Sequence, residues 1–261
     1  MAISERARQV HDELFPDHVS TLAVTDPELI ECFDNFAFDE VLQQTNLDAK
    51  TRLMVQLASM IACQAHREYR VMLGAALNVG VSAVEAKEIV YQAVPYVGMA
   101  KVFDVLHITN EVLAERGIEL PLEGQSTSTP QTRMQRGLDV QRQIITAERV
   151  EQLYATAQPD ELQIQHLLSA NCFGDHVSRG GIDIRTRELL TFSMLISLGG
   201  CEPQAASHAA ANVRVGNDRA VLIDVITQLL PYIGYPRMLN ALRLINEAAP
   251  ARAPRPDGSA S

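Results

Sequence analysis

The residues of this sequence that are best suited to acid–base chemistry lie close together at Cys201, Gln204 and His208. If the segment after Cys201 is a helix, Gln204 and His208 share one face and Cys201 precedes the first turn. The helix dipole would stabilise a Cys201 thiolate, and an imidazole titrates near neutrality. The spacing therefore predicts a site that could donate or accept a proton. In the structural alternative, Cys201 packs as a small hydrophobic residue and His208 is a hydrogen-bonded core histidine.

Three charged residues, Arg185, Arg187 and Glu188, precede this group and begin another expected helix. The arginines could bind a substrate carboxylate through paired N–H donors, although arginines in a first helical turn commonly form surface ion pairs. Glu188 could face the site, or it could be a first-turn carboxylate that the helix dipole favours.

A weaker set of similar residues, Cys63, His66 and Glu68, lies in the first half of the chain. It suggests a second, altered site. A Cys-x-x-His pair without partner ligands is poor evidence for a metal centre, so we expect no metal here. The first half should be structural, or it should contribute side chains to the site in the second half.

Composition limits the possible partners. The chain has 261 residues, 47% of them hydrophobic, which is enough for one large or two modest cores. The net charge of -10, without clustered Lys and Arg, argues against a nucleic acid partner. A polar amino terminus and the lack of a long apolar run predict a cytoplasmic protein without membrane contact. The four cysteines should therefore be free thiols.

An internal repeat organises the chain. Residues 80–98 run parallel to residues 216–234, with Gly, Pro, Tyr and Gly at matched positions. Upstream, Asp48-Ala-Lys-Thr-Arg52 matches Asp183-Ile-Arg-Thr-Arg187. Matched glycines and prolines have backbone roles, so each copy should fold in the same way.

The repeat predicts an all-α fold, because Ala, Leu, Val and Ile recur at helical spacing and alternating stretches are few. Each copy should contain a first helix (about 27–44 and 160–178), a helix capped by Asp48 or Asp183, a helix through Ala76 or Asn212, a helix that ends before Pro95 or Pro231, and a last helix from Gly98 or Gly234. The expected units are a helical extension (1–25), a first repeat (26–117), a turn-rich linker (118–140), a second repeat (141–248) and a disordered tail (249–261).

The repeat resembles the carboxymuconolactone decarboxylase family, which is related to alkylhydroperoxidase D. The second copy carries most of the likeness, in Arg185-Thr-Arg-Glu-Leu-Leu, Gly199-Gly-Cys-Glu-Pro-Gln-Ala-Ala-Ser-His208, Asn212-Val-Arg-Val-Gly-Asn-Asp-Arg219 and residues 228–236; the first copy adds residues 75–80 and 91–98. The resemblance implies two tandem alkylhydroperoxidase D-like helical repeats, of which the first is degenerate and the second active. Because single-copy members assemble into rings, it also implies a homotrimer of tandem chains.

The resemblance also suggests roles for individual residues. The peroxidase branch of the family has Cys-x-x-Cys followed by His, whereas here Gln204 replaces the second Cys, so a dithiol cycle cannot run within this motif. The decarboxylase branch has Glu or Gln four residues before His, which Gln204 and His208 satisfy. In the first copy Glu68 is kept, but Met72 replaces the His. His176 is a further cavity candidate, because the family often has an aromatic residue at that place.

The activity that the resemblance implies is decarboxylation of a small carboxylated lactone, similar to 4-carboxymuconolactone, in aromatic-compound catabolism. Conjugation of the carboxylate with the lactone carbonyl lets a dienolate form without any cofactor, so the protein need only stabilise the enolate oxygen and deliver a proton. His208 would donate the proton, Gln204 and Cys201 would orient, and Arg187 would hold the second carboxylate.

Three alternatives stay open. One is a thiol-dependent peroxidase or reductase that uses Cys201. Another is a lactone or keto-acid enzyme of a biosynthetic pathway that does not decarboxylate. The third is a non-catalytic helical scaffold.

Overall fold

The computed structural model describes residues 2–16, 18 and 20–251, and over these residues the chain is helical without strands. The elements are α1 (Glu5–Leu14), α2 (Leu22–Thr25), α3 (Pro27–Asn35), η1 (Phe36–Glu40), η2 (Leu42–Gln44), α4 (Ala49–Cys63), α5 (His66–Asn78), α6 (Ala83–Val97), α7 (Met99–Glu115), α8 (Arg133–Ile145), α9 (Ala147–Thr156), α10 (Leu162–Leu167), η3 (Leu168–Val177), α11 (Ile184–Leu198), α12 (Glu202–Arg214) and α13 (Arg219–Ala248). The all-α prediction is confirmed. The tail expected to be disordered lies outside the described residues from position 252 onward.

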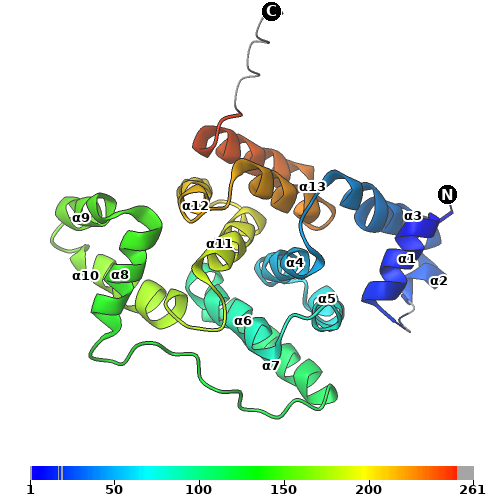
Figure 1. Cartoon of the computed structure of the whole chain (residues 1–261), viewed down its shortest axis with the longest axis horizontal. Coiled ribbons are helices and arrows are strands. Elements are labelled where there is room, and N and C mark those ends of the chain that lie inside the picture. Colours follow the sequence, from blue (N-terminus) through cyan, green and yellow to red (C-terminus); the bar gives the residue numbers. More distant parts are fainter. Residues whose placement is uncertain (1, 17, 19, 252–261) are drawn as a thin grey trace, which may run out of the picture.

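The matched helices α4 and α11 form the centre of the molecule (Figure 1). Each begins at a predicted aspartate cap: Asp48 accepts from the Thr51 N–H at 2.9 Å, and Asp183 from the Thr186 N–H at 3.0 Å. Both helices are apolar on nearly every side, so each must be covered all round. The cover comes from both copies, and together they form one continuous core.

Polar contacts also join the two copies across this core. The hydroxyls of Ser59 and Ser197 lie 2.7 Å apart, and Gln92 Nε2 donates to the Arg187 carbonyl at 2.7 Å. Both contacts are buried. The copies therefore face each other through α4 and α6 of the first copy and α11 of the second, and a site in one copy can include side chains of the other.

The prediction that helices end before Pro95 and Pro231 is wrong. Helix α6 continues through Pro95 to Val97, and α13 continues through Pro231 to a kink at Gly234, whose φ is 76°. Proline lacks an N–H, so the carbonyl four residues before it loses its helical partner. At Tyr91 that carbonyl lies 3.0 Å from His176 Nδ1, which takes the place of the missing donor.

The first helix of each copy widens in its second half. Helix α3 passes into η1, and α10 passes into η3, both of which are π-helical. Such wide turns are rare and commonly occur at functional sites. In the second copy, η3 carries Cys172 and Phe173 into the site described below.

The predicted linker at 118–140 is too long, because residues 133–140 already belong to α8. This helix packs on η3 through two glycines. A Cβ added to Gly137 would lie 1.8 Å from the Ser169 carbonyl oxygen, and one added to Gly174 would lie 2.1 Å from the Arg133 carbonyl oxygen. Gly137 therefore permits close helix packing here, although in the sequence it looks like a linker glycine.

The remaining connection crosses the surface from α7 to α8, as Figure 1 shows. At the other end, the predicted helical extension forms α1 and α2, and the Ser4 N–H donates to Asn35 Oδ1 at 2.7 Å. No helix within the described residues has the length and apolar character needed to cross a membrane.

Candidate active site

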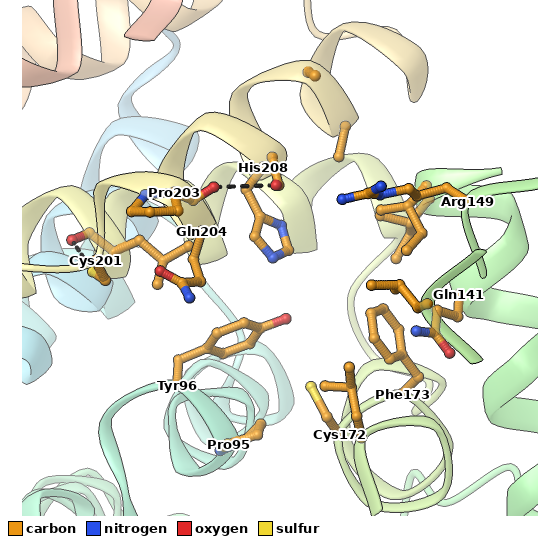
Figure 2. Close-up of a pocket in the computed structure, with 18 of the residues that line it drawn as sticks. Pro95, Tyr96, Gln141, Arg149, Cys172, Phe173, Cys201, Pro203, Gln204 and His208 are labelled. Carbon is orange, nitrogen blue, oxygen red and sulfur yellow. Dashed lines mark hydrogen bonds between the residues drawn. The ribbon is translucent and has the colours of Figure 1, made fainter. Parts of the chain in front are cut away.

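A cavity of about 820 Å³ lies between the second copy, the end of α6 and the α8–α9 pair (Figure 2). Its lining includes Pro95, Tyr96, Gln141, Ile144, Arg149, Leu168, Cys172, Phe173, Cys201, Gln204, His208 and Arg214. The walls are mainly apolar with a few polar groups, as is usual for a small-molecule site. Of the residues predicted from the sequence, Cys201, Gln204 and His208 share this cavity.

His208 is held by Glu188. The His208 Nδ1 atom lies 2.8 Å from Glu188 Oε2, and the side chains are 14% and 1% exposed. A buried carboxylate at one ring nitrogen fixes the ring and balances the charge of an imidazolium. The other nitrogen, Nε2, makes no hydrogen bond within the described part of the chain, and Figure 2 shows the ring directed into the cavity. This pair can exchange a proton with a bound molecule.

Two asparagines fix the backbone around this pair. Asn212 Nδ2 donates to the Glu188 carbonyl at 3.0 Å and to the His208 carbonyl at 2.8 Å. Asn217 Nδ2 donates to Asn212 Oδ1 at 2.8 Å, and its own Oδ1 accepts from Arg185 Nε at 2.7 Å. Arg185 thus supports the helices that carry the pair, and the structure does not bring it to the cavity as a substrate contact.

Tyr96, which belongs to the first copy, faces His208. The two rings meet edge to face with centroids 5.8 Å apart. The Tyr96 hydroxyl is buried and has no hydrogen bond of normal geometry to any residue that the structure describes. Burial, with the nearby Cys172 and Glu188, raises the pKa of Tyr96 well above its ordinary value, so the hydroxyl remains a neutral donor. The Pro-Tyr-x-Gly motif recurs in both copies, and this recurrence could have identified Tyr96 as a candidate site residue.

Two cysteines line the cavity, and neither is activated. Cys201 donates from Sγ to the Leu195 carbonyl at 3.2 Å, and burial and Glu202 raise the pKa of this thiol. Burial raises the pKa of Cys172 to about 12. Desolvation and a neighbouring carboxylate both oppose the expected dipole-stabilised thiolate at Cys201.

Arg187 does not reach the cavity, which corrects its expected role at a substrate carboxylate. It is 1% exposed, and its guanidinium donates to Glu88 at 2.9 Å, to Gln92 Oε1 at 2.8 Å and to three backbone carbonyls. Each of its three guanidinium nitrogens donates to a group inside the protein. His176 is likewise used at the Tyr91 carbonyl and is absent from the cavity lining.

Two other arginines, Arg149 and Arg214, do line the cavity, and both are exposed at its edge. Arg149 Nη1 donates to Gln152 Oε1 at 2.6 Å. Its helix, α9, is capped by Thr146, a non-glycine residue with φ of 83° whose hydroxyl accepts from the Arg149 N–H at 3.3 Å. Neither arginine was a predicted site residue, although Arg149 lies within the predicted second repeat and Arg214 within the segment Asn212–Arg219 that resembles the family.

The first-copy candidates do not line this cavity. Cys63 Sγ lies 3.8 Å from the Ser197 carbonyl, and burial raises the pKa of the thiol. Burial and the nearby Asp34 raise the pKa of Glu68. His66 Nε2 is buried without a hydrogen bond to any described residue. Over the same residues, no group of three His, Cys, Asp or Glu side chains is arranged to hold a metal ion.

The family follows from comparison with known proteins. The profile of the carboxymuconolactone decarboxylase family matches residues 27–111 and again residues 163–247. These segments make up more than half of the chain, so the protein belongs to this family and contains its domain twice. The predicted family and tandem arrangement are confirmed.

A 4-carboxymuconolactone decarboxylase of Acinetobacter baylyi (strain ATCC 33305 / BD413 / ADP1) is 32% identical over 83 residues. The aligned segment covers 32% of this chain and 62% of that protein. Helices α8 and α9 lie between the two family segments. The cavity wall that contains Arg149 is therefore outside the matched domains.

Proposed function

We propose that this protein is a cofactor-independent decarboxylase of a small carboxylated lactone, similar to 4-carboxymuconolactone. The observation that supports this most strongly is the His208–Glu188 pair: a buried carboxylate 2.8 Å from one ring nitrogen, and the opposite side of the ring in a largely apolar cavity. The family and the name of the Acinetobacter relative point to the same chemistry.

In the proposed reaction, the bond between the γ-carbon and its carboxylate breaks and carbon dioxide leaves. The electron pair of that bond passes through the conjugated system to the carbonyl oxygen of the lactone and gives a dienolate. The His208 imidazolium then gives its Nε2 proton to the carbon α to the carbonyl, and solvent restores that proton. The net reaction consumes one proton and releases one carbon dioxide, and Glu188 holds the ring throughout.

Tyr96 and Gln204 are the proposed donors to the dienolate oxygen. Both line the cavity beside His208, and Figure 2 shows both side chains next to its ring. The raised pKa of Tyr96 suits a hydroxyl that donates a hydrogen bond without losing its proton. A preorganised donor to a developing oxyanion commonly lowers the activation free energy by about 2.7 to 4 kcal/mol, which corresponds to a rate increase of about a hundredfold or more.

Arg149 is the proposed anchor for the second carboxylate, in place of Arg187. It is an exposed guanidinium at the cavity edge, on the opposite wall from Cys201 in Figure 2. An anchor at the edge would leave the apolar centre to the scissile carboxylate, where loss of its charge is favoured by desolvation. Arg214 would add to the positive field at the same edge.

The thiol-peroxidase alternative receives less support. A peroxidatic cysteine reacts as a thiolate, and the pKa values of both cavity thiols are raised. A family enzyme that acts on another lactone or keto acid would use the same His208–Glu188 pair. Turnover of 4-carboxymuconolactone distinguishes that enzyme from a decarboxylase of this lactone.

The test is turnover of enzymatically generated 4-carboxymuconolactone, followed by lactone absorbance and by release of carbon dioxide. Wild type should turn over the lactone, and His208→Gln should lower kcat by about 100-fold to 10,000-fold, the usual contribution of a general acid. His107→Gln, which changes an exposed histidine of α7, is the matched control and should leave kcat unchanged. Equal turnover by wild type and His208→Gln would contradict the proposal.

A further inference from the structure

A second cavity, of about 330 Å³, lies under the surface connection that follows α7. Helix α6 supplies Lys87, Glu88 and Tyr91, α7 supplies Asn110, and Arg179 follows η3. Residues 120–125 cover these side chains, and the Gly180 N–H holds the cover by donating to the Gln125 carbonyl at 2.8 Å. None of the lining residues is shared with the His208 cavity.

Lys87 is the unusual residue of this cavity, because it is only 9% exposed. Its ammonium donates to Asn110 Oδ1 and lies 5.5 Å from the centre of the Tyr91 ring. Within the described residues, no carboxylate lies within ion-pair distance of Nζ. An ammonium has three donors, so two remain for another acceptor. Buried lysines are rarely left without a partner, since desolvation of the charge is unfavourable.

The neighbouring charges do not compensate for Lys87. The Glu88 carboxylate accepts from both Arg179 and Arg187, each at 2.9 Å, so one negative charge faces two guanidinium groups. Arg179 also lies 5.1 Å above the Tyr91 ring. Glu123 is the other acid in the lining and is exposed to solvent. The buried part of the cavity therefore has an excess of positive charge, in a chain whose net charge is -10.

We propose that this cavity binds a small aliphatic carboxylate, with the carboxylate at Lys87 and Asn110 and the hydrocarbon part against the residues that cover them. The carboxylate would use the free donors of Lys87 and the amide N–H groups of Asn110. Val84, Leu120, Pro121 and Leu122 contribute apolar side chains to the same lining. The volume is at the lower end of the range for ligand cavities. Burial lowers the pKa of Lys87, and a bound anion would favour its charged form.

Butyrate is the probe, and isothermal titration calorimetry at constant ionic strength is the measurement. The Arg149→Met variant serves as the background, so that the cation at the edge of the larger cavity does not contribute. In this background butyrate should bind at one site per chain. Adding Lys87→Met should raise the Kd at least tenfold, and adding Lys101→Met, at a lysine outside the cavity, should leave it within twofold.

Asn110→Leu provides a second variant in case Lys87→Met does not fold, as judged by circular dichroism; it should weaken butyrate binding at least threefold. A Kd that is unaffected in the folded Lys87 and Asn110 variants would overturn the proposal. If inorganic phosphate bound as tightly as butyrate, the proposed preference for an aliphatic carboxylate would be overturned. This site does not depend on the proposed reaction, since it would be present whether or not the protein decarboxylates a lactone.

Discussion

Replacing Gly137 with alanine should destabilise the protein and displace one wall of the active-site cavity. The added Cβ would lie 1.8 Å from the Ser169 carbonyl oxygen and 2.8 Å from the Gly174 amide nitrogen. Both atoms belong to backbone, so α8 itself must move by more than 1 Å, roughly the gap to ordinary contact distance. Such overpacking costs about 1–3 kcal/mol, and here we expect the upper end even after the gain in helix propensity.

For a chain of this size that loss corresponds to a fall in Tm of roughly 5–10 °C, measured by circular dichroism. Gly74→Ala is the matched control, because it is also a helical glycine but its added Cβ would meet its nearest neighbour at 3.5 Å, an ordinary contact. It should be neutral or stabilising by about 0.5–1 kcal/mol. If Gly137→Ala were as stable as Gly74→Ala, the close packing of α8 on η3 would be refuted.

Two further predictions concern the cavity. Arg149→Met should raise KM for the carboxylated lactone by about tenfold to a hundredfold, because a hydrogen bond to a charged group contributes about 1.5–3 kcal/mol. The kcat should change little, since this bond would be made equally in the ground and transition states. A loss of kcat at constant KM would contradict the anchoring role. Alkylation of Cys201 by iodoacetamide, followed by mass spectrometry, should become faster up to and beyond pH 9. The pKa of this thiol is raised above its ordinary value, and the thiolate forms only as the pH rises through that pKa. A rate that levels off below pH 8 would instead indicate an activated thiolate.

Features that depend on backbone conformation could be predicted from the sequence. Asp48 and Asp183 cap helices because a short carboxylate at that position accepts the free N–H groups of the first turn. Gly98 and Gly234 mark the breaks between helices because their φ values, 86° and 76°, favour glycine. These positions recur in both copies, so the repeat itself predicts these boundaries.

The candidate site could be predicted only in part. Gln204 and His208 are recognisable because they lie four residues apart on one helix. The partnership of His208 with Glu188 depends on how α11 and α12 pack, and Tyr96 comes from the other copy, so neither contact has a local signal. Arg187 illustrates the opposite error: its type suggested a substrate contact, but Glu88 and Gln92 of the first copy use its donors.

The wrongly placed boundaries have the same origin. Pro95 normally ends a helix, but here His176 occupies the carbonyl that the proline leaves free, so the helix continues. Gly137 resembles a linker residue until its contact with Ser169 is known. In each case a distant part of the chain determines the local structure.

The most direct test of the proposed mechanism is decarboxylation of 4-carboxymuconolactone in D2O, with the product analysed by nuclear magnetic resonance. A single donor on one side of the cavity should place one deuteron, on one face only, at the carbon α to the lactone carbonyl, and His208→Gln should form this product far more slowly. Absence of product, or a deuteron distributed over both faces in wild type, would contradict proton delivery by the His208–Glu188 pair.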